Sequence, residues 1–153
     1  MQDLTYLQEA AQYPDENAKR FIAVLNKKVE IGRLMNALGH MTARLVAQID
    51  DVKELCFLDY HDANGGIHPA ISHYPFIVLR ADNANKIRKV RDELIQRQIP
   101  FTDFVDTMTI GTSAEQRQAT AERIESELDY FGICMFGDTE ELKKITGKFT
   151  LFR

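Results

Sequence analysis

The segment from Phe21 to Ile49 constrains the fold more than any other part of this 153-residue sequence. It opens with a continuous apolar run, Phe21–Leu25, which is short enough to be a strand buried on both faces. Apolar residues then recur at spacings of three and four over about five helical turns. These residues are Ile31, Leu34, Met35, Leu38, Met41, Leu45, Val46 and Ile49. The pattern predicts a buried strand followed by a long amphipathic helix.

Strand and helix patterns continue to alternate along the rest of the chain. The predicted strands are Leu55–Asp59, Phe76–Arg80, Phe101–Thr107 and Gly132–Phe136. The predicted helices carry an apolar stripe from Ile87 to Ile95, a polar stretch opening at Ser113, and a short segment Thr139–Ile145. Such alternation predicts a single α/β domain, with a mixed sheet and helices on both faces. We expect it to span residues 21–153, after an N-terminal extension over residues 1–20.

Local signals predict how several of these elements begin and end. Asp82 or Asn83 can cap the helix that follows the strand Phe76–Arg80. Ser113 and Gln116 have the spacing of a capping box. The stretch from Tyr60 to Tyr74 is predicted to be a loop because it holds Asp62-Ala63-Asn64-Gly65-Gly66.

Composition excludes several classes of protein. Hydrophobic residues make up 44% of the chain, and a chain of this length buries enough surface to fold without disulfides. The formal net charge of −4 argues against a protein that coats nucleic acid, which would need concentrated Lys and Arg. Cys56 and Cys134 lie in apolar runs typical of buried core cysteines. With no signal-peptide pattern and no bilayer-length apolar stretch, we expect a cytoplasmic protein that does not enter membranes.

The polar side of the long helix is the first candidate site. Two arginines and a histidine aligned on one helix face can hold an anion, and the imidazole can transfer a proton. A solvated helix face is the alternative, because such residues are common there. Gly39 lies in the same helix, where glycine costs about 1 kcal/mol relative to alanine and often marks close approach of another backbone. The residues assigned to this face are Arg33, Asn36, Ala37, His40 and Arg44.

Two further segments place polar residues at the ends of predicted strands. Lys28 lies in the turn between the first strand and the long helix, where backbone N–H groups favour anions. Asp106 lies near the end of the predicted strand Phe101–Thr107 and Thr109 lies just after it, at the strand end where ligands bind in open α/β sheets. Turn-stabilising contacts are the alternative role for Asp106. The histidines of the Tyr60–Tyr74 loop lack metal-ligand spacing, so we expect no metal and no cofactor.

Four segments resemble the archaeal and eukaryotic (type II) peptidyl-tRNA hydrolases. Val24 to His40 resembles their first strand and helix, and Phe76–Arg80 resembles their second core strand. Phe104–Asp106 is similar to the strand that ends in their motif aspartate, and Lys144–Leu151 to their closing helix and final strand. The run Leu-Met-Asn-Ala-Leu-Gly-His also resembles an uncharacterised bacterial family, a domain of unknown function, with this fold.

The resemblance implies a site and a substrate class. His40 and Asp106 match catalytic positions, and Thr109, the third catalytic candidate, falls one residue earlier than the threonine of the motif. Arg33 and Arg80 match positions that hold the substrate, and we add Lys28 and Asn36 as substrate-binding candidates from their places in the turn and on the helix face. Arg33 and Arg80 stand in place of lysines and Ala37 in place of a glutamine, so the motif is incomplete. We therefore keep three hypotheses: a protein that binds a small anionic ligand or a partner, an ester hydrolase acting on peptidyl-tRNA or a related substrate, and a non-catalytic interaction protein. The resemblance also implies a homodimer.

Overall fold

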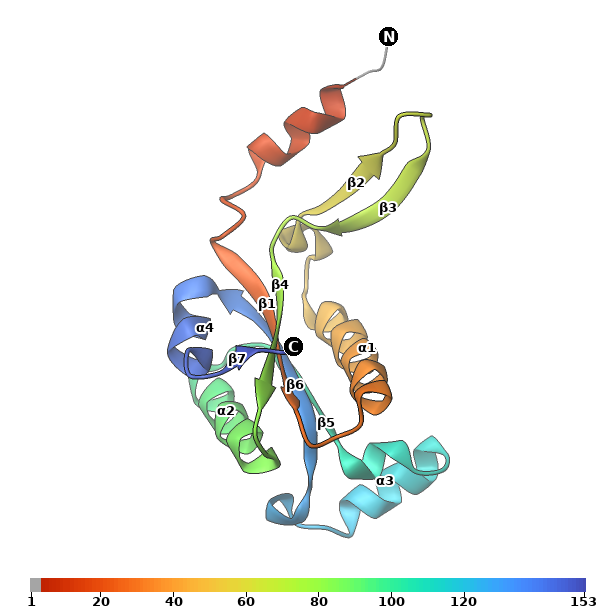
Figure 1. Ribbon diagram of the computed structural model, residues 1–153, viewed down its shortest axis with the longest axis vertical. Helices are drawn as coiled ribbons and strands as arrows, with labels where there is room; N and C mark the ends of the chain where they lie inside the picture. The colour runs from red at the N-terminus through yellow and green to blue at the C-terminus, as the bar shows by residue number, and fades with distance from the viewer. Residues whose placement is uncertain (1–3) are drawn as a thin grey trace.

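The computed structural model describes residues 4–153, and a five-stranded mixed sheet of order β5-β6-β1-β4-β7 forms its centre (Figure 1). β1 (Lys19–Asn26) runs parallel to β4 (Phe76–Ala81) and antiparallel to β6 (Tyr130–Asp138). β5 (Phe101–Val105) and the short β7 (Thr150–Leu151) pair antiparallel at the two edges. The sheet confirms the predicted single α/β domain with mixed strands.

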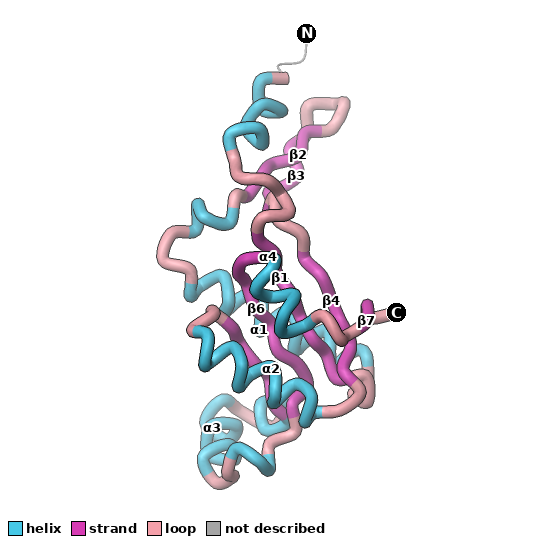
Figure 2. The backbone as a smooth tube through the Cα atoms, turned by 90° about the vertical axis from the view of Figure 1, so that its left-hand side faces the viewer, coloured by secondary structure: helices cyan, strands magenta, loops and turns pink. Residues whose placement is uncertain are grey.

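Helices cover both faces of this sheet, as the alternating pattern predicts (Figures 1 and 2). α1 (Ile31–Gln48) packs on one face, and α2 (Ala84–Arg97) and α4 (Thr139–Thr146) pack on the other. Side chains alternate along β1, so its odd-numbered residues join the core under α1 and its even-numbered residues join the core under α2 and α4. Because both faces are covered, the run Phe21–Asn26 is buried throughout.

The structure divides the predicted apolar stripe of α1. Leu34, Met41 and Leu45 are almost fully buried against the sheet, as predicted. Ile31 and Met35 are 55% and 67% exposed instead. Ala37 was assigned to the polar face but is fully buried. The predicted stripe was wider than the surface that the sheet can cover, since a helix buries only one side of its circumference against one partner.

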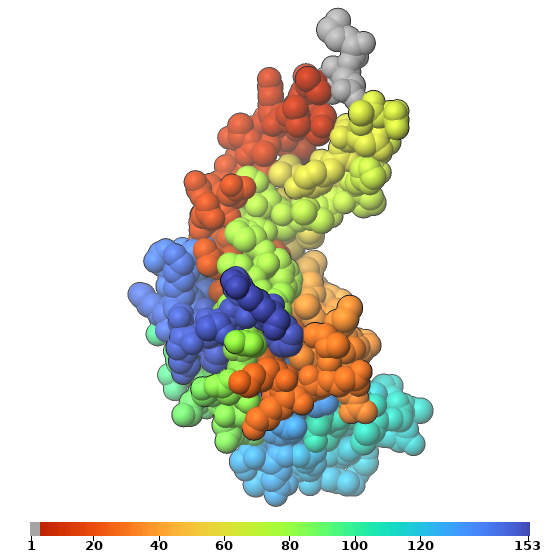
Figure 3. All heavy atoms as spheres, viewed as in Figure 1, coloured from red at the N-terminus to blue at the C-terminus, as the bar shows by residue number. Residues whose placement is uncertain are grey.

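A two-stranded hairpin projects from the body of the molecule as an arm (Figures 1 and 3). It consists of β2 (Phe57–His61) and β3 (Ile67–Ser72), and the 3₁₀ helix η2 (Val52–Leu55) precedes it. The 3₁₀ helix η1 (Thr5–Gln12) lies alongside, where Tyr6 stacks on His61 with ring centroids 3.9 Å apart. The loop predicted at Asp62–Gly66 is confirmed as the turn of this hairpin, whereas its wider extent from Tyr60 to Tyr74 is wrong because β3 lies within it.

A small helical lobe follows β5 at the far end of the molecule from the arm (Figure 1). It comprises the 3₁₀ helix η3 (Asp106–Thr109), α3 (Ser113–Ala121) and the 3₁₀ helix η4 (Glu125–Glu127). The cap of α3 lies one residue earlier than the predicted capping box, because Thr112 and Glu115 make the reciprocal contacts instead of Ser113 and Gln116. Within residues 4–153, no helix combines the length and apolar character needed to cross a bilayer.

Candidate functional site

The polar side of α1 faces η3 and α3 across a groove. One part of this groove has a volume of about 470 Å³, and its lining residues are Glu30, Gly32, Arg33, Asn36, His40, Met108, Thr109 and Gln116. An adjoining part of about 280 Å³ shares His40, Met108 and Gln116 and extends to Arg44 and Phe104. Both parts form one candidate site, which we call the α1–α3 groove. Its walls come from a helix and a lobe that are distant in the sequence.

Two arginines line the α1–α3 groove. Arg33 and Arg44 flank His40 along α1, and all three are exposed. Among the described residues, neither arginine has an ion-pair partner, whereas Arg88, Arg91 and Arg123 each pair with a carboxylate. The guanidinium groups of the groove are therefore available to an anion.

The other polar groups of the groove supply both hydrogen-bond donors and acceptors. The amides of Asn36 and Gln116 face it from opposite walls. The Thr109 hydroxyl donates to the Asp106 carbonyl over 2.7 Å, so its oxygen can only accept from a ligand. Glu30 is the one carboxylate among the residues that line the larger part. A ligand with both acceptor oxygens and a hydroxyl or amine donor suits this set.

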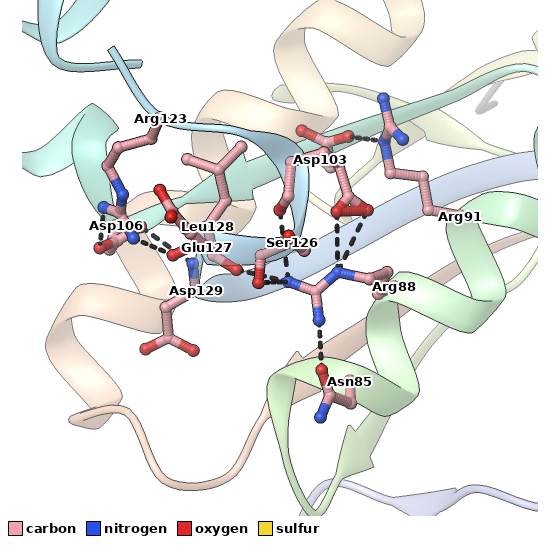
Figure 4. A network of polar contacts seen from close by, with 11 residues as sticks. Asn85, Arg88, Arg91, Asp103, Asp106, Arg123, Ser126, Glu127, Leu128 and Asp129 are labelled. Carbon is pink, nitrogen blue, oxygen red and sulfur yellow. Dashed lines mark hydrogen bonds and ion pairs between the residues drawn. The ribbon is translucent and has the colours of Figure 1, made fainter. Parts of the chain in front are cut away.

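The carboxylate of Asp106 accepts hydrogen bonds from Arg123 and from the backbone of Asp129 beside the groove (Figure 4). We call this set of contacts the Asp106 bracket. Oδ2 of Asp106 accepts from Arg123 Nη1 at 2.7 Å, and Oδ1 accepts from the Asp129 backbone N–H at 3.0 Å. Burial raises the pKa of Asp106, but the hydrogen bonds from Arg123 and Asp129 outweigh it and lower the pKa overall. Both carboxylate oxygens thus tie η3 to the segment that leads into β6, and Asp106 does not line the groove with His40.

Asp103 lies on the opposite side of β5 from Phe104, because successive side chains along a strand alternate in direction. Its carboxylate accepts from Arg91 Nε of α2 at 2.9 Å, while Phe104 belongs to the core under α1. Burial raises the pKa of Asp103 in spite of Arg91. Although Asp103 borders the smaller part of the groove, its charge is engaged in this ion pair.

The structure separates three of the predicted site residues from the others. Lys28 lines a different cavity, of about 380 Å³, together with Asn83 at the start of α2 and Arg88. Arg80 projects from β4, where its Nε donates to the Thr150 hydroxyl at 3.2 Å. Arg33, Asn36, His40 and Thr109 come together in the α1–α3 groove, and Lys28, Arg80 and Asp106 lie outside its lining.

Arg88 organises a polar network that the sequence analysis missed (Figure 4). Its Nε donates to both carboxylate oxygens of Glu125, at 2.9 and 3.1 Å, and its Nη2 donates to the Leu128 carbonyl at 2.7 Å. Arg88 also contacts Asn85 through Nη1. Its guanidinium lies 5.2 Å from the ring centroid of Tyr130. The side chain of Arg88 therefore holds the segment between η4 and β6 against α2.

Metal-ligating side chains do not gather in the part of the chain that the structure describes. Within residues 4–153, no group of three His, Cys, Asp or Glu side chains is positioned to hold a metal ion. His68 contacts Asp62 at 3.2 Å, and His73 contacts the Pro14 carbonyl at 3.0 Å, so these histidines brace the arm and its base.

Comparison with known proteins identifies a family and a shared fold. A solved structure, that of the protein of unknown function Atu0240 from Agrobacterium tumefaciens strain C58, superposes with a TM-score of 0.75. The two share 20% sequence identity over 89% of this chain and 98% of that one, which shows a common fold. No curated protein matches. The family model described as a protein of unknown function (DUF2000) matches residues 19–153, and the chain therefore belongs to the DUF2000 family.

Proposed function

We propose that this protein binds a small anionic ligand, with phosphate or carboxylate groups, in the α1–α3 groove. The observation that carries the proposal is the pair of guanidinium groups, Arg33 and Arg44, which lie on either side of His40 and have no ion-pair partner within residues 4–153. Arginine matches phosphate and carboxylate geometry with two parallel hydrogen bonds, which gives both affinity and orientation. The chain is acidic overall, so this concentration of positive charge is local.

The size and chemistry of the groove favour a metabolite-sized ligand. Its larger part, about 470 Å³, lies within the range of typical small-molecule sites. The amides of Asn36 and Gln116 can hydrogen-bond ligand oxygens from opposite walls. Glu30 disfavours a second anionic group at its end of the groove and can accept from a ligand hydroxyl or amine. A ligand with one anionic end and one polar, uncharged end fits best.

Ester hydrolysis, which the resemblance to type II peptidyl-tRNA hydrolases suggests, is the second candidate. His40 and Thr109 meet in the groove and support it. The Asp106 bracket counts against it, because both carboxylate oxygens already accept hydrogen bonds from Arg123 and Asp129. A catalytic carboxylate needs hydrogen-bond reach to the water or group that it activates. Binding without hydrolysis is therefore our preferred function.

Titration calorimetry with inorganic phosphate, pyrophosphate and a carboxylate such as citrate tests the binding proposal. Arg33→Gln and Arg44→Gln should each weaken binding about tenfold, the effect of losing one charge-assisted interaction. The matched control is Arg97→Gln, since Arg97 is exposed on α2 and does not line the groove. Equal losses in all three variants, or no binding of any probe to the wild type, would contradict the proposal.

Release of N-blocked amino acid from N-acyl-aminoacyl-tRNA separates the two candidates. Our proposal expects no turnover by wild-type protein that binds the anionic probes. Turnover that is lost in Asp106→Asn but kept in Arg123→Gln would instead assign catalysis to Asp106. Arg123→Gln is the control because it breaks the same bracket while keeping the carboxylate.

A further inference from the structure

A second cavity lies where the arm joins the body of the molecule. Its volume is about 540 Å³, within the range of typical small-molecule sites. In Figure 3 the surface is hollowed between the yellow-green arm and the orange helix α1. None of the residues that line this cavity also lines the α1–α3 groove. We call it the arm pocket, and its main apolar side chains are Phe57, Tyr60 and Ile71 of the arm and Phe21, Val46 and Phe76 of the body.

The arm pocket is apolar and carries no permanent charge. Among the described residues that line it there is no Asp, Glu, Lys or Arg, in a chain with 27% charged residues. Three of its large side chains, Phe57, Phe76 and Ile71, are 37%, 41% and 60% exposed. Covering apolar surface of this kind is favourable because it removes the surface from water. A ligand that gains affinity here must itself be largely apolar.

The polar groups that line the arm pocket are already engaged within the chain. Thr42 and Ser72 each donate their hydroxyl hydrogen to a backbone carbonyl, at 2.8 and 2.5 Å. The Ser72 oxygen also accepts from the Tyr74 N–H at 3.1 Å, and His73 Nε2 contacts the Pro14 carbonyl at 3.0 Å. A charged ligand would lose its hydration in this pocket without gaining an ionic partner. The pocket therefore selects against charge.

The base of the arm fixes the distance between the two walls of the pocket. The N–H of His73, directly after β3, donates to the carbonyl of Cys56, directly before β2, at 2.8 Å. Cys56 is buried and has a φ of 51°, which residues other than glycine rarely adopt. This conformation turns the chain from η2 into β2 and so sets the direction of the arm. The shape of the pocket is therefore set by the fold itself.

We infer that the arm pocket binds an uncharged, largely apolar small molecule with an aromatic ring, which contacts the arm and α1 together. Phe57, Tyr60 and Phe76 contribute aromatic rings, against which a ligand ring can pack edge-to-face or in an offset stack. The pocket and the α1–α3 groove thus take ligands of opposite character. This inference is independent of the proposed anion site.

Fluorescence titration of the full chain with N-phenyl-1-naphthylamine, an uncharged aromatic dye that brightens when it leaves water, tests the inference. The wild type should bind one dye molecule per chain. Ile71→Asp should weaken binding at least about tenfold, because it places a charge in the wall of the pocket. The matched control is Ile67→Asp, since Ile67 lies on the same strand, is 63% exposed and does not line the pocket. The control should change the dissociation constant less than about twofold.

Two further measurements test the chemistry and the place of binding. The dye 8-anilinonaphthalene-1-sulfonate has the same ring system with an added negative charge, and it should not displace the uncharged dye at equal concentration. Nuclear Overhauser effects from the bound uncharged dye to the methyl groups of both Val46 and Ile71 should place it between α1 and the arm.

Four results would overturn the inference. They are the absence of saturable binding to the wild type, equal weakening in Ile71→Asp and Ile67→Asp, displacement by the sulfonate, and dye contacts to only one wall. Sedimentation equilibrium adds a check on the occupant. A wild-type mass of two chains that falls to one in Ile71→Asp would show that a second copy of the chain, and not a small molecule, fills the arm pocket.

Discussion

A residue of this protein that matches a motif position does not always have a side chain free to carry out the function of the motif. Asp106 follows its strand as the motif resemblance implies, yet its carboxylate is taken up by Arg123 and Asp129. The sequence pattern can predict where a strand ends, but it does not show which side chain will bind a carboxylate there. For Asp106 that partner is Arg123, seventeen residues farther along the chain. Arg33 and Arg44 lack such a neighbour within residues 4–153, and this gives them their functional interest.

The lowered pKa of Asp106 predicts how its bracket responds to acid. A carboxyl group whose folded pKa is depressed stabilises the fold above its unfolded pKa, about 3.9, and loses this contribution as pH falls through the folded value. Asp106→Asn should therefore make the free energy of unfolding less dependent on pH below about pH 4. Urea unfolding followed by circular dichroism between about pH 3 and pH 7 measures this. If the free energy of unfolding of Asp106→Asn depended on pH as steeply as that of the wild type, the hydrogen bonds of Asp106 would not stabilise the fold as we expect.

At the scale of elements, the ion pairs of Arg123 with Asp106 and of Arg88 with Glu125 help to hold the lobe of η3, α3 and η4 to the rest of the domain. No residue of α3 is buried. Arg88 supplies a strong anchor, because its side chain, only 18% exposed, joins Glu125 to the carbonyl of Leu128. The lobe forms one wall of the α1–α3 groove through Thr109 and Gln116. Anchoring by Arg88 therefore bears indirectly on the shape of the candidate site.

Arg88→Lys should loosen this lobe although it keeps the charge. A lysine ammonium cannot reproduce the planar fork that reaches a carboxylate and a carbonyl together. We expect a loss of about 2–3 kcal/mol in the free energy of unfolding, the scale for buried charge-assisted hydrogen bonds. Thermal unfolding checks the magnitude, with Lys89→Arg as a control on the neighbouring position. A loss below about 0.5 kcal/mol would show that the network contributes little.

Elements with one strong signal could be predicted from the sequence, and elements that depend on distant partners could not. The run Phe21–Leu25 and the buried positions Leu34, Met41 and Leu45 follow from local periodicity. β3 was missed because its exposed residues, Ile67 and Ile71, alternate without a buried face and follow a glycine-rich turn. His40 and Gln116 line the same groove because of tertiary packing, which the spacing of residues in the sequence does not reveal.

At the scale of the whole molecule, a well-packed body carries a thin arm. β1 and β6 are buried almost end to end, whereas Tyr60, Ile67 and Ile71 of the arm are 50% to 63% exposed. A two-stranded hairpin has little stability of its own in water. The stacking of Tyr6 on His61 and the contact of His73 with Pro14 link the arm and its base to the N-terminal segment.

Native-state hydrogen exchange should reveal this difference. Amides that pair β2 with β3, such as those near Tyr60 and Ile67, should exchange at least ~100-fold faster than amides in β1 and β6, because local opening of the arm costs less than opening the sheet. Exchange monitored by NMR gives both rates in one sample. Equal protection in arm and sheet would mean that the arm opens only when the whole domain unfolds.

The position of β6 also sets the order in which the chain can fold during synthesis. β6 lies between β5 and β1, and it pairs Asp138 with Lys19 from near the start of the chain. Until the ribosome has released residues 130–138, one edge of β1 has no partner and β5 has no sheet to join. Contacts this distant in sequence make folding slow, and unpaired apolar strands favour aggregation while they wait. A nascent chain stalled before Tyr130 therefore exposes unpaired edges on β1 and β5, which favour aggregation.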